Sequence, residues 1–254
     1  MSTPDELGQP LTLTDHLTEL RDRLIKALFA IALGTAICYY FSPQLFDVIR
    51  QPILKYLPEG GLIFTNPMDK FMAHMKLAVL GGFIVTCPVW LFQVWMFVAP
   101  GLYSHEKRYS MMFIASGVSL FATGVAFVYY LVLPMAFGFL LTFGGDTDKP
   151  MITIGEYLAF FSTMTLVFGA AFELPLILVL LGAIGLIDHH FLRKQRRFAV
   201  VLLATLSAVI TPPDILSMLM LLVPLWGLYE ISILLVAMMS KKRAKAAAAE
   251  ASSE

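Results

Sequence analysis

The sequence predicts an all-α integral membrane protein with six transmembrane helices. Hydrophobic residues make up 58% of the 254 residues and charged residues 14%, and the mean hydropathy is +0.77. About six apolar stretches each approach the ~20 residues that a helix needs to cross a bilayer. Lipid cannot hydrogen-bond a backbone, so a spanning segment must be a helix or part of a closed barrel. Because the apolar stretches are continuous rather than alternating, they exclude a barrel.

The whole chain is expected to form a single polytopic membrane domain. The expected spans cover residues 24–41, 71–98, 111–141, 156–187, 198–211 and 215–239, followed by a polar cytoplasmic tail at 240–254. The last two spans are expected to be short. Residues 198–211 give about 21 Å of helix, against a hydrocarbon core of ~30 Å, and Glu230 interrupts the final apolar run. They would either thin the lipid locally or form a hairpin that does not fully cross.

Four prolines lie deep inside the expected spans: Pro88, Pro134, Pro175 and Pro224. Each removes a backbone hydrogen bond and bends its helix. Bent helices favour a curved wall with a concave side over a straight bundle, although membrane helices also tolerate proline without such a role.

The placement of lysine and arginine predicts the orientation of the chain. With the N-terminus inside, thirteen of the 18 basic residues lie on inside segments and five on outside segments. Cytoplasmic loops carry such an excess of basic residues. Both termini are therefore expected to be cytoplasmic.

An amphipathic helix is expected at about residues 13–23, lying at the cytoplasmic interface and running into the first span. Its apolar stripe is formed by Leu13, Leu17, Leu20 and Leu24, which recur at helical spacing. Glu19 projects away from this stripe. It is either an acid poised for function or a solvated side chain that pairs with Arg23 one turn later.

Glu106 is a second acid on the same expected membrane face as Glu19, in the next cytoplasmic stretch. It precedes two bases, Lys107 and Arg108. It is either a carboxylate stabilised by the start of a helix or a second acidic group for binding.

Glu173 lies in the middle of an apolar stretch without a basic neighbour. An intramembrane charge is costly, and such acids are functional by default. The alternative is a neutral carboxyl group hydrogen-bonded to a carbonyl that Pro175 frees. For Glu230, a position at the cytoplasmic end of the last helix and a buried position both remain open.

Motifs for nucleotide binding, zinc-dependent proteolysis and serine hydrolysis are absent from the sequence. We therefore expect no enzyme activity, cofactor or metal. The two cysteines, Cys38 and Cys87, lie in apolar runs and are expected to be buried as small hydrophobic residues rather than paired in a disulfide.

Four motifs, in this order, resemble the TatC family, the multispanning receptor subunit of the bacterial twin-arginine translocase. They are Asp15-His16-Leu17-x-Glu19-Leu20-Arg21-x-Arg23, Gln93-Val94-Trp95-x-Phe97-x-x-Pro100-x-Leu102-Tyr103-x-x-Glu106, Phe172-Glu173-Leu174-Pro175 and Thr211-Pro212-Pro213-Asp214. The resemblance implies six helices in a concave, cupped wall in the bacterial cytoplasmic (inner) membrane. It also implies binding of twin-arginine signal peptides of folded proteins, assembly with the single-span TatA and TatB subunits, and export driven by the proton gradient.

The same resemblance implies roles for individual residues. Glu19 and Glu106 would bind the arginines of the signal, and Glu173 would lie in the membrane-embedded concave face. The candidates for structural roles or partner contacts are Pro52, Phe97, Pro212, Pro213, Asp214 and Glu230. Two alternatives remain, a proton-coupled small-solute transporter that uses Glu173 and a structural scaffold without a substrate.

Overall fold

The computed structural model describes residues 13–57, 61–98, 107–142, 150–183, 185–211 and 215–251. Its elements are α1 (Leu13–Tyr40), α2 (Ser42–Ile49), α3 (Gln51–Leu54), α4 (Pro67–Val85), α5 (Cys87–Val98), α6 (Lys107–Phe127), the π-helical η3 (Val128–Val132), α7 (Leu133–Leu140), α8 (Ile154–Phe172), α9 (Leu174–Ala183), α10 (His189–Lys194), α11 (Arg196–Ile210) and α12 (Ile215–Ala251). Among the described residues the one β feature is an isolated bridge between Ile63 and Thr153. The predicted all-α class is confirmed.

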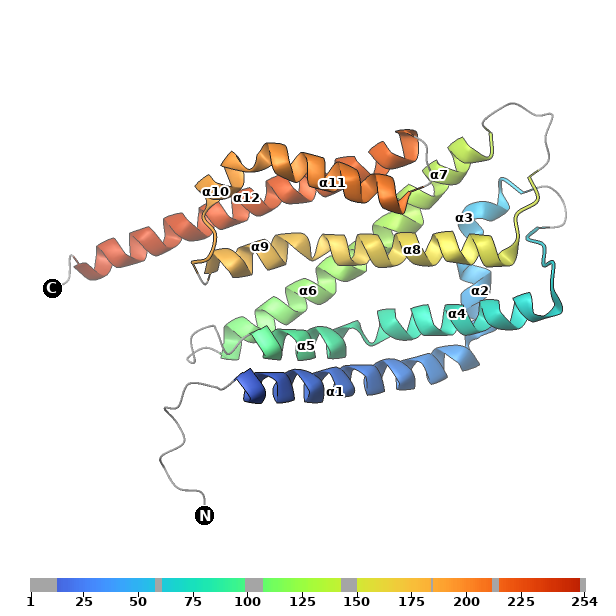
Figure 1. Ribbon diagram of the computed structural model, residues 1–254, viewed down its shortest axis with the longest axis horizontal. Helices are drawn as coiled ribbons and strands as arrows, with labels where there is room; N and C mark the ends of the chain where they lie inside the picture. Colours follow the sequence, from blue (N-terminus) through green and yellow to red (C-terminus); the bar gives the residue numbers. More distant parts are fainter. Residues whose placement is uncertain are drawn as a thin grey trace, which may run out of the picture.

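The helices stand side by side as an open wall (Figure 1). α1 packs on α4 and α5, α4 and α6 pack on α8, and α9 packs on α12, which also contacts α11. The α6–α7 segment runs obliquely and crosses α8, on which α6 packs (Figure 1). In the described part of the chain, α1 and the α11–α12 pair lie at opposite sides, so the wall does not close into a bundle.

Within the described residues, four helical stretches are long and apolar enough to cross a membrane: His16–Tyr40, Met111–Leu140, Ile154–Ala183 and Met218–Lys241. A fifth candidate is the bent pair Pro67–Val85 and Cys87–Phe97. Large apolar side chains on these helices stay exposed, with Phe29 72% and Leu234 58% accessible. Exposed apolar surface on this scale would be a liability in water but suits contact with lipid. The chain is therefore a multi-pass membrane protein.

The last helix differs from expectation. α11 has 15 residues, which is about 22 Å of helix, but α12 is not short. It runs without a break through Pro224 and Glu230 to Ala251, and its stretch Met218–Lys241 is of membrane length. The expectation that both final helices are short is wrong for α12. One partly exposed acid does not end a helix, and the Lys- and Ala-rich continuation has high helix propensity.

Three of the four prolines coincide with a break in a helix. Pro88, Pro134 and Pro175 each occupy the second position of the helix that follows the break, in α5, α7 and α9. The α4–α5 pair bends by 57°, the π-helical segment precedes α7, and Glu173 forms the turn between α8 and α9. Proline produces such breaks because its ring clashes with the carbonyl four residues earlier and it has no N–H to donate.

Tyrosine side chains attach α2 to the centre of the wall. The hydroxyl of Tyr129 in η3 donates to the carbonyl of Val48 at 2.8 Å, and that of the buried Tyr157 in α8 donates to the carbonyl of Ile49. These carbonyls belong to the last turn of α2, where helical carbonyls have no partner within the helix. The hydroxyls therefore satisfy the end of α2 and hold it against the core.

Small residues bring the backbones of α1 and α4 into contact. A Cβ atom added to Gly82 would lie 2.5 Å from the backbone nitrogen of Thr35. A Cβ atom on Gly34 would lie 3.0 Å from the carbonyl oxygen of Gly82. Close approach of small residues is a main source of helix association in membranes, where no hydrophobic effect drives one helix onto another.

We expect Gly82→Ala to lower the free energy of unfolding by about 1–3 kcal/mol, the usual range for overpacking. The new methyl group would meet backbone atoms of α1, which cannot rotate away. The measurement is thermal unfolding of the purified protein in detergent. Gly155→Ala in the first turn of α8 is the matched control, because a Cβ atom there meets nothing within 4 Å. Equal melting temperatures for both variants would contradict the close α1–α4 contact.

Candidate functional site

Glu19 lies near the start of α1 and is paired with Arg23. The Nε and Nη2 atoms of Arg23 both donate to Oε1 of Glu19, at 2.9 and 2.5 Å. The exposed fraction is 25% for the Glu19 side chain and 17% for Arg23. This is the pairing that their spacing of four residues predicts. Among the described residues no donor contacts Oε2, so half of the carboxylate stays available.

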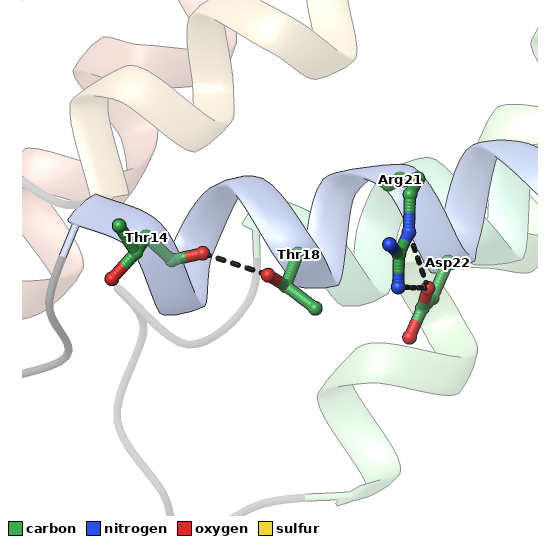
Figure 2. A network of polar contacts seen from close by, with 4 residues as sticks. All are labelled: Thr14, Thr18, Arg21 and Asp22. Carbon is green, nitrogen blue, oxygen red and sulfur yellow. Dashed lines mark hydrogen bonds and ion pairs between the residues drawn. The ribbon is translucent and has the colours of Figure 1, made fainter.

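The neighbouring polar residues of α1 form a separate, more exposed set (Figure 2). Arg21 donates to Oδ1 of Asp22 through Nε and Nη2, at 3.1 and 2.9 Å. The hydroxyl of Thr18 donates to the carbonyl of Thr14 at 2.9 Å. Asp22 is therefore an acid on the same helix as Glu19, with an arginine partner of its own.

Phe97 secures the start of α1 against the end of α5. Its ring stacks on the imidazole of His16, with ring centroids 4.4 Å apart and an interplanar angle of 19°. The predicted contact residue Phe97 thus makes a contact within the chain, one turn of helix from Glu19. Glu106, the other predicted signal-binding acid, lies outside the described residues, between the end of α5 and the start of α6.

Glu173 is nearly buried inside the wall, with 8% of its surface exposed. It forms the turn between α8 and α9. Within the described residues, its Oε1 atom has no hydrogen-bond partner. The hydrogen bond to a carbonyl freed by Pro175, which is the alternative interpretation of Glu173, is therefore not made by this oxygen.

Sequence reasoning missed the residues that surround Glu173. A Cβ atom on Gly117 of α6 would lie 3.3 Å from Oε2 of Glu173 and 3.2 Å from Leu176, so glycine leaves the room that the carboxyl group occupies. The buried thiol of Cys87 in α5 lies close enough to interact electrostatically with Glu173. Both cysteines are free and buried, as predicted. No sequence spacing relates residues 87, 117 and 173, and only the packing of α5, α6 and the α8–α9 turn joins them.

Glu230 is engaged in a contact between helices. Its Oε2 atom accepts a hydrogen bond from Arg196 at 2.6 Å, which joins α12 to the first residue of α11. Next to it, the hydroxyl of Tyr229 donates to the carbonyl of Leu192 in α10 at 2.9 Å. Of the two positions left open for Glu230, the structure shows a partly exposed, paired acid at the junction of α10, α11 and α12.

Of the remaining candidates for structural roles or partner contacts, the structure describes only Pro52. Pro52 is buried in the first turn of α3, beside the fully buried Ile53. Pro212, Pro213 and Asp214 lie outside the described residues, in the α11–α12 connection. Thr211, just before them, closes α11 by donating its backbone N–H and its hydroxyl to the carbonyl of Ser207, at 3.0 and 2.8 Å.

Asp188, His189 and His190 offer ligand atoms within 4.8 Å of one another at the start of α10. The Nδ1 atom of His189 lies 2.7 Å from Oδ1 of Asp188. Desolvation raises the pKa of the Asp188 carboxyl, but the hydrogen bonds and charge of His189 outweigh it, so this pKa lies below its usual range. The three residues are consecutive, so their proximity follows from the sequence and does not by itself indicate a metal site.

We expect Glu173→Met to raise the free energy of unfolding by about 1–3 kcal/mol, the penalty of a buried polar atom without a partner. Methionine is unbranched and similar in length, so it fits the same space. Glu156→Met at the other end of α8 should do the opposite, because Glu156 accepts a hydrogen bond from the Thr153 hydroxyl at 2.9 Å in a capping box. The loss of that cap costs about 1 kcal/mol. Thermal unfolding in detergent compares the two variants, and a destabilised Glu173→Met protein would contradict this account of Glu173.

The sequence is similar to proteins of a known family. The family model for TatC, the Sec-independent protein translocase protein, matches residues 15–224. The TatC protein of Desulforapulum autotrophicum is 41% identical over 231 residues, which cover 91% of this chain and 86% of that protein. The TatC protein of Azotobacter chroococcum is 40% identical, with 92% of each chain covered.

Solved structures agree with the sequence comparison. A crystal structure of the twin-arginine translocase receptor TatC superimposes with a TM-score of 0.80 at 36% identity, over 89% of this chain and 99% of that one. A second crystal structure of the same receptor, determined in DDM, has a TM-score of 0.80 at 37% identity. The family match, the similarity to relatives along most of the chain and the shared fold lead to one conclusion: the chain belongs to the TatC family of Sec-independent protein translocase proteins.

Proposed function

We propose that this chain is the receptor component of a twin-arginine translocase and binds the signal peptides of folded proteins. The observation that carries the proposal is the superposition on the TatC receptor over nearly the whole chain. The family consists of components of a protein translocase rather than of known enzymes. Membership of this family favours a receptor over a small-solute transporter that uses Glu173.

The membrane orientation is part of the proposal. We infer six spans in the bacterial cytoplasmic membrane, with both termini cytoplasmic and α11 as the short span. The start of α1, the end of α5, the start of α6 and the end of α12 lie at one end of the wall (Figure 1). The basic last turn of α10, with Arg193 and Lys194, lies there too. These features support that end as the cytoplasmic side, since basic residues accumulate there.

Glu19 supplies the chemistry for recognising arginine. A guanidinium group is a planar fork that matches a carboxylate in bidentate geometry, and lysine cannot reproduce it. Arg23 places two N–H groups on Oε1 of Glu19, so a guanidinium of the signal can place two N–H groups on the remaining Oε2 in the same way. We propose Glu106 as the second acid, so that two carboxylates meet two adjacent arginines.

The remaining predicted residues belong to assembly in this proposal. The single-span subunits TatA and TatB would dock at α11–α12, around Pro212, Pro213 and Asp214, where the short α11 thins the lipid. Glu173 would meet a polar group of a partner after the helices around Cys87 and Gly117 separate. Export would draw on the proton gradient.

We expect Glu19→Gln and Glu106→Gln each to weaken binding of an Arg-Arg signal peptide by about tenfold, the effect of losing one hydrogen bond between charged groups. Binding is measured on the purified full chain in detergent. An otherwise identical Lys-Lys peptide should bind weakly to wild type and lose little more in either variant.

Asp22→Asn is the matched control for Glu19→Gln. It removes an acid from the same helix but from the exposed Arg21 pair, so Arg-Arg peptide binding should stay at the wild-type value. If Glu19→Gln bound the Arg-Arg peptide as tightly as wild type, or if Asp22→Asn lost as much affinity, the proposed recognition by Glu19 would be wrong.

A further inference from the structure

A groove lies where α1 ends, α2 starts and α4 begins. These helix ends lie at the opposite end of the wall from the start of α1 (Figure 1). Its volume is about 830 Å³, within the range of sites that hold small molecules. Ala36 of α1 and Phe71 of α4 are among the residues that line it. None of the residues assigned to signal binding or to assembly contributes to this groove.

The groove lies at the end of a membrane-length helix, where a spanning helix would meet the lipid headgroups. The membrane-length stretch of α1 ends at Tyr40, and the chain turns into α2 directly afterwards. Tyr39, Tyr40 and Phe71 line the groove and are exposed, with Tyr40 80% accessible. Aromatic side chains gather at this boundary because they present an apolar ring and, in tyrosine, a polar hydroxyl.

The polar side chains in the groove suit an anion. Lys70 is exposed on the first turn of α4, and in the described part of the chain it forms no ion pair and no acid lines the groove. The neighbouring Asp69 forms the capping box of α4 instead, and its Oδ2 atom accepts hydrogen bonds from the backbone N–H groups of Thr65 and Asn66 at 3.0 and 2.8 Å. Lys70 therefore presents an uncompensated positive charge.

His74 adds a second polar group, one turn of α4 after Lys70. Its Nδ1 atom lies 3.1 Å from the hydroxyl oxygen of the buried Ser42, and its ring packs against Phe46 with centroids 5.6 Å apart. These contacts fix the orientation of the imidazole. When Ser42 donates to Nδ1, the ring proton lies on Nε2, which is then a hydrogen-bond donor for a phosphate oxygen.

We propose that this groove binds one anionic phospholipid, with its phosphate at Lys70 and His74 and its upper acyl chain along the apolar wall around Ala36 and Phe71. The combination of a cation, an imidazole held in place by Ser42 and aromatic walls matches the two chemical halves of a phospholipid. A free phosphate would use only the polar half. The bound lipid would fill the space between α1 and α4 at the α2 turn.

The test is native mass spectrometry of the purified full chain, mixed with phosphatidylglycerol or with phosphatidylcholine of the same acyl chains. Wild type should retain one phosphatidylglycerol in preference to phosphatidylcholine. Lys70→Gln should retain about fivefold less phosphatidylglycerol, the effect of one lysine at a lipid surface. Lys76→Gln is the matched control: it removes the same charge from an exposed position of α4 outside the groove and should match wild type.

A second variant tests the apolar half of the site. Ala36 is exposed, so Ala36→Trp should fill the groove and displace the lipid without disturbing buried contacts, as unfolding in detergent would verify. The proposal is overturned if Lys70→Gln retains as much phosphatidylglycerol as wild type, or if Lys76→Gln loses as much as Lys70→Gln. It is equally overturned if both lipids are retained alike, or if inorganic phosphate displaces phosphatidylglycerol, since the site would then hold a free anion.

Discussion

Lipid offers no hydrogen-bond partner to a backbone, so every break in a spanning helix has to be repaired within the protein. At the α4–α5 bend, the Thr86 hydroxyl donates to the carbonyl of Gly82 at 2.7 Å and the Trp90 indole donates to that of Phe83 at 2.9 Å. Before Pro134, the π-helical segment changes the pattern of backbone hydrogen bonds, so that the N–H of Leu133 donates to the carbonyl of Val128, five residues earlier. The breaks at Pro88 and Pro134 thus leave none of these carbonyls unpaired.

The break between α8 and α9, just before Pro175, explains the unusual position of Glu173. Its backbone is satisfied, since its N–H donates to Ala170 and its carbonyl accepts from Ile177. Its side chain, in contrast, points into a space that Gly117 leaves open and that holds no donor for Oε1 among the described residues. The acids near the ends of the wall, Glu19 and Glu230, have arginine partners. The chain therefore keeps the carboxyl group of Glu173 in a costly environment inside the wall, and such a position is typical of a residue kept for function rather than for stability.

The two ends of the wall are built differently. At the α2 end, tyrosine hydroxyls tie the last turn of α2 to η3 and α8, and Tyr56 donates to the carbonyl of Pro134 at 3.2 Å. The segments around Ile63 and Ile152 also pair there, with backbone hydrogen bonds of 3.1 and 2.8 Å on the two sides of Ile63. At the Glu19 end, the start of α1 is held by the stacked rings of His16 and Phe97, and its ion pairs join exposed or half-buried side chains. Peripheral contacts of this kind rearrange at low cost, which would suit the peptide binding that we propose for this end.

The sequence by itself determined the features that depend on near neighbours. Apolar runs specify a helical membrane protein, the spacing of Glu19 and Arg23 specifies their pair, and prolines mark three of the breaks. Tertiary structure decided the rest. Arg196 and Glu230 meet across 34 residues, Cys87 and Gly117 come to Glu173 from two other helices, and Pro224 sits in an unbroken α12. Hydropathy and helical period report only on the four or so residues around each position, whereas these contacts depend on how separate helices pack against one another.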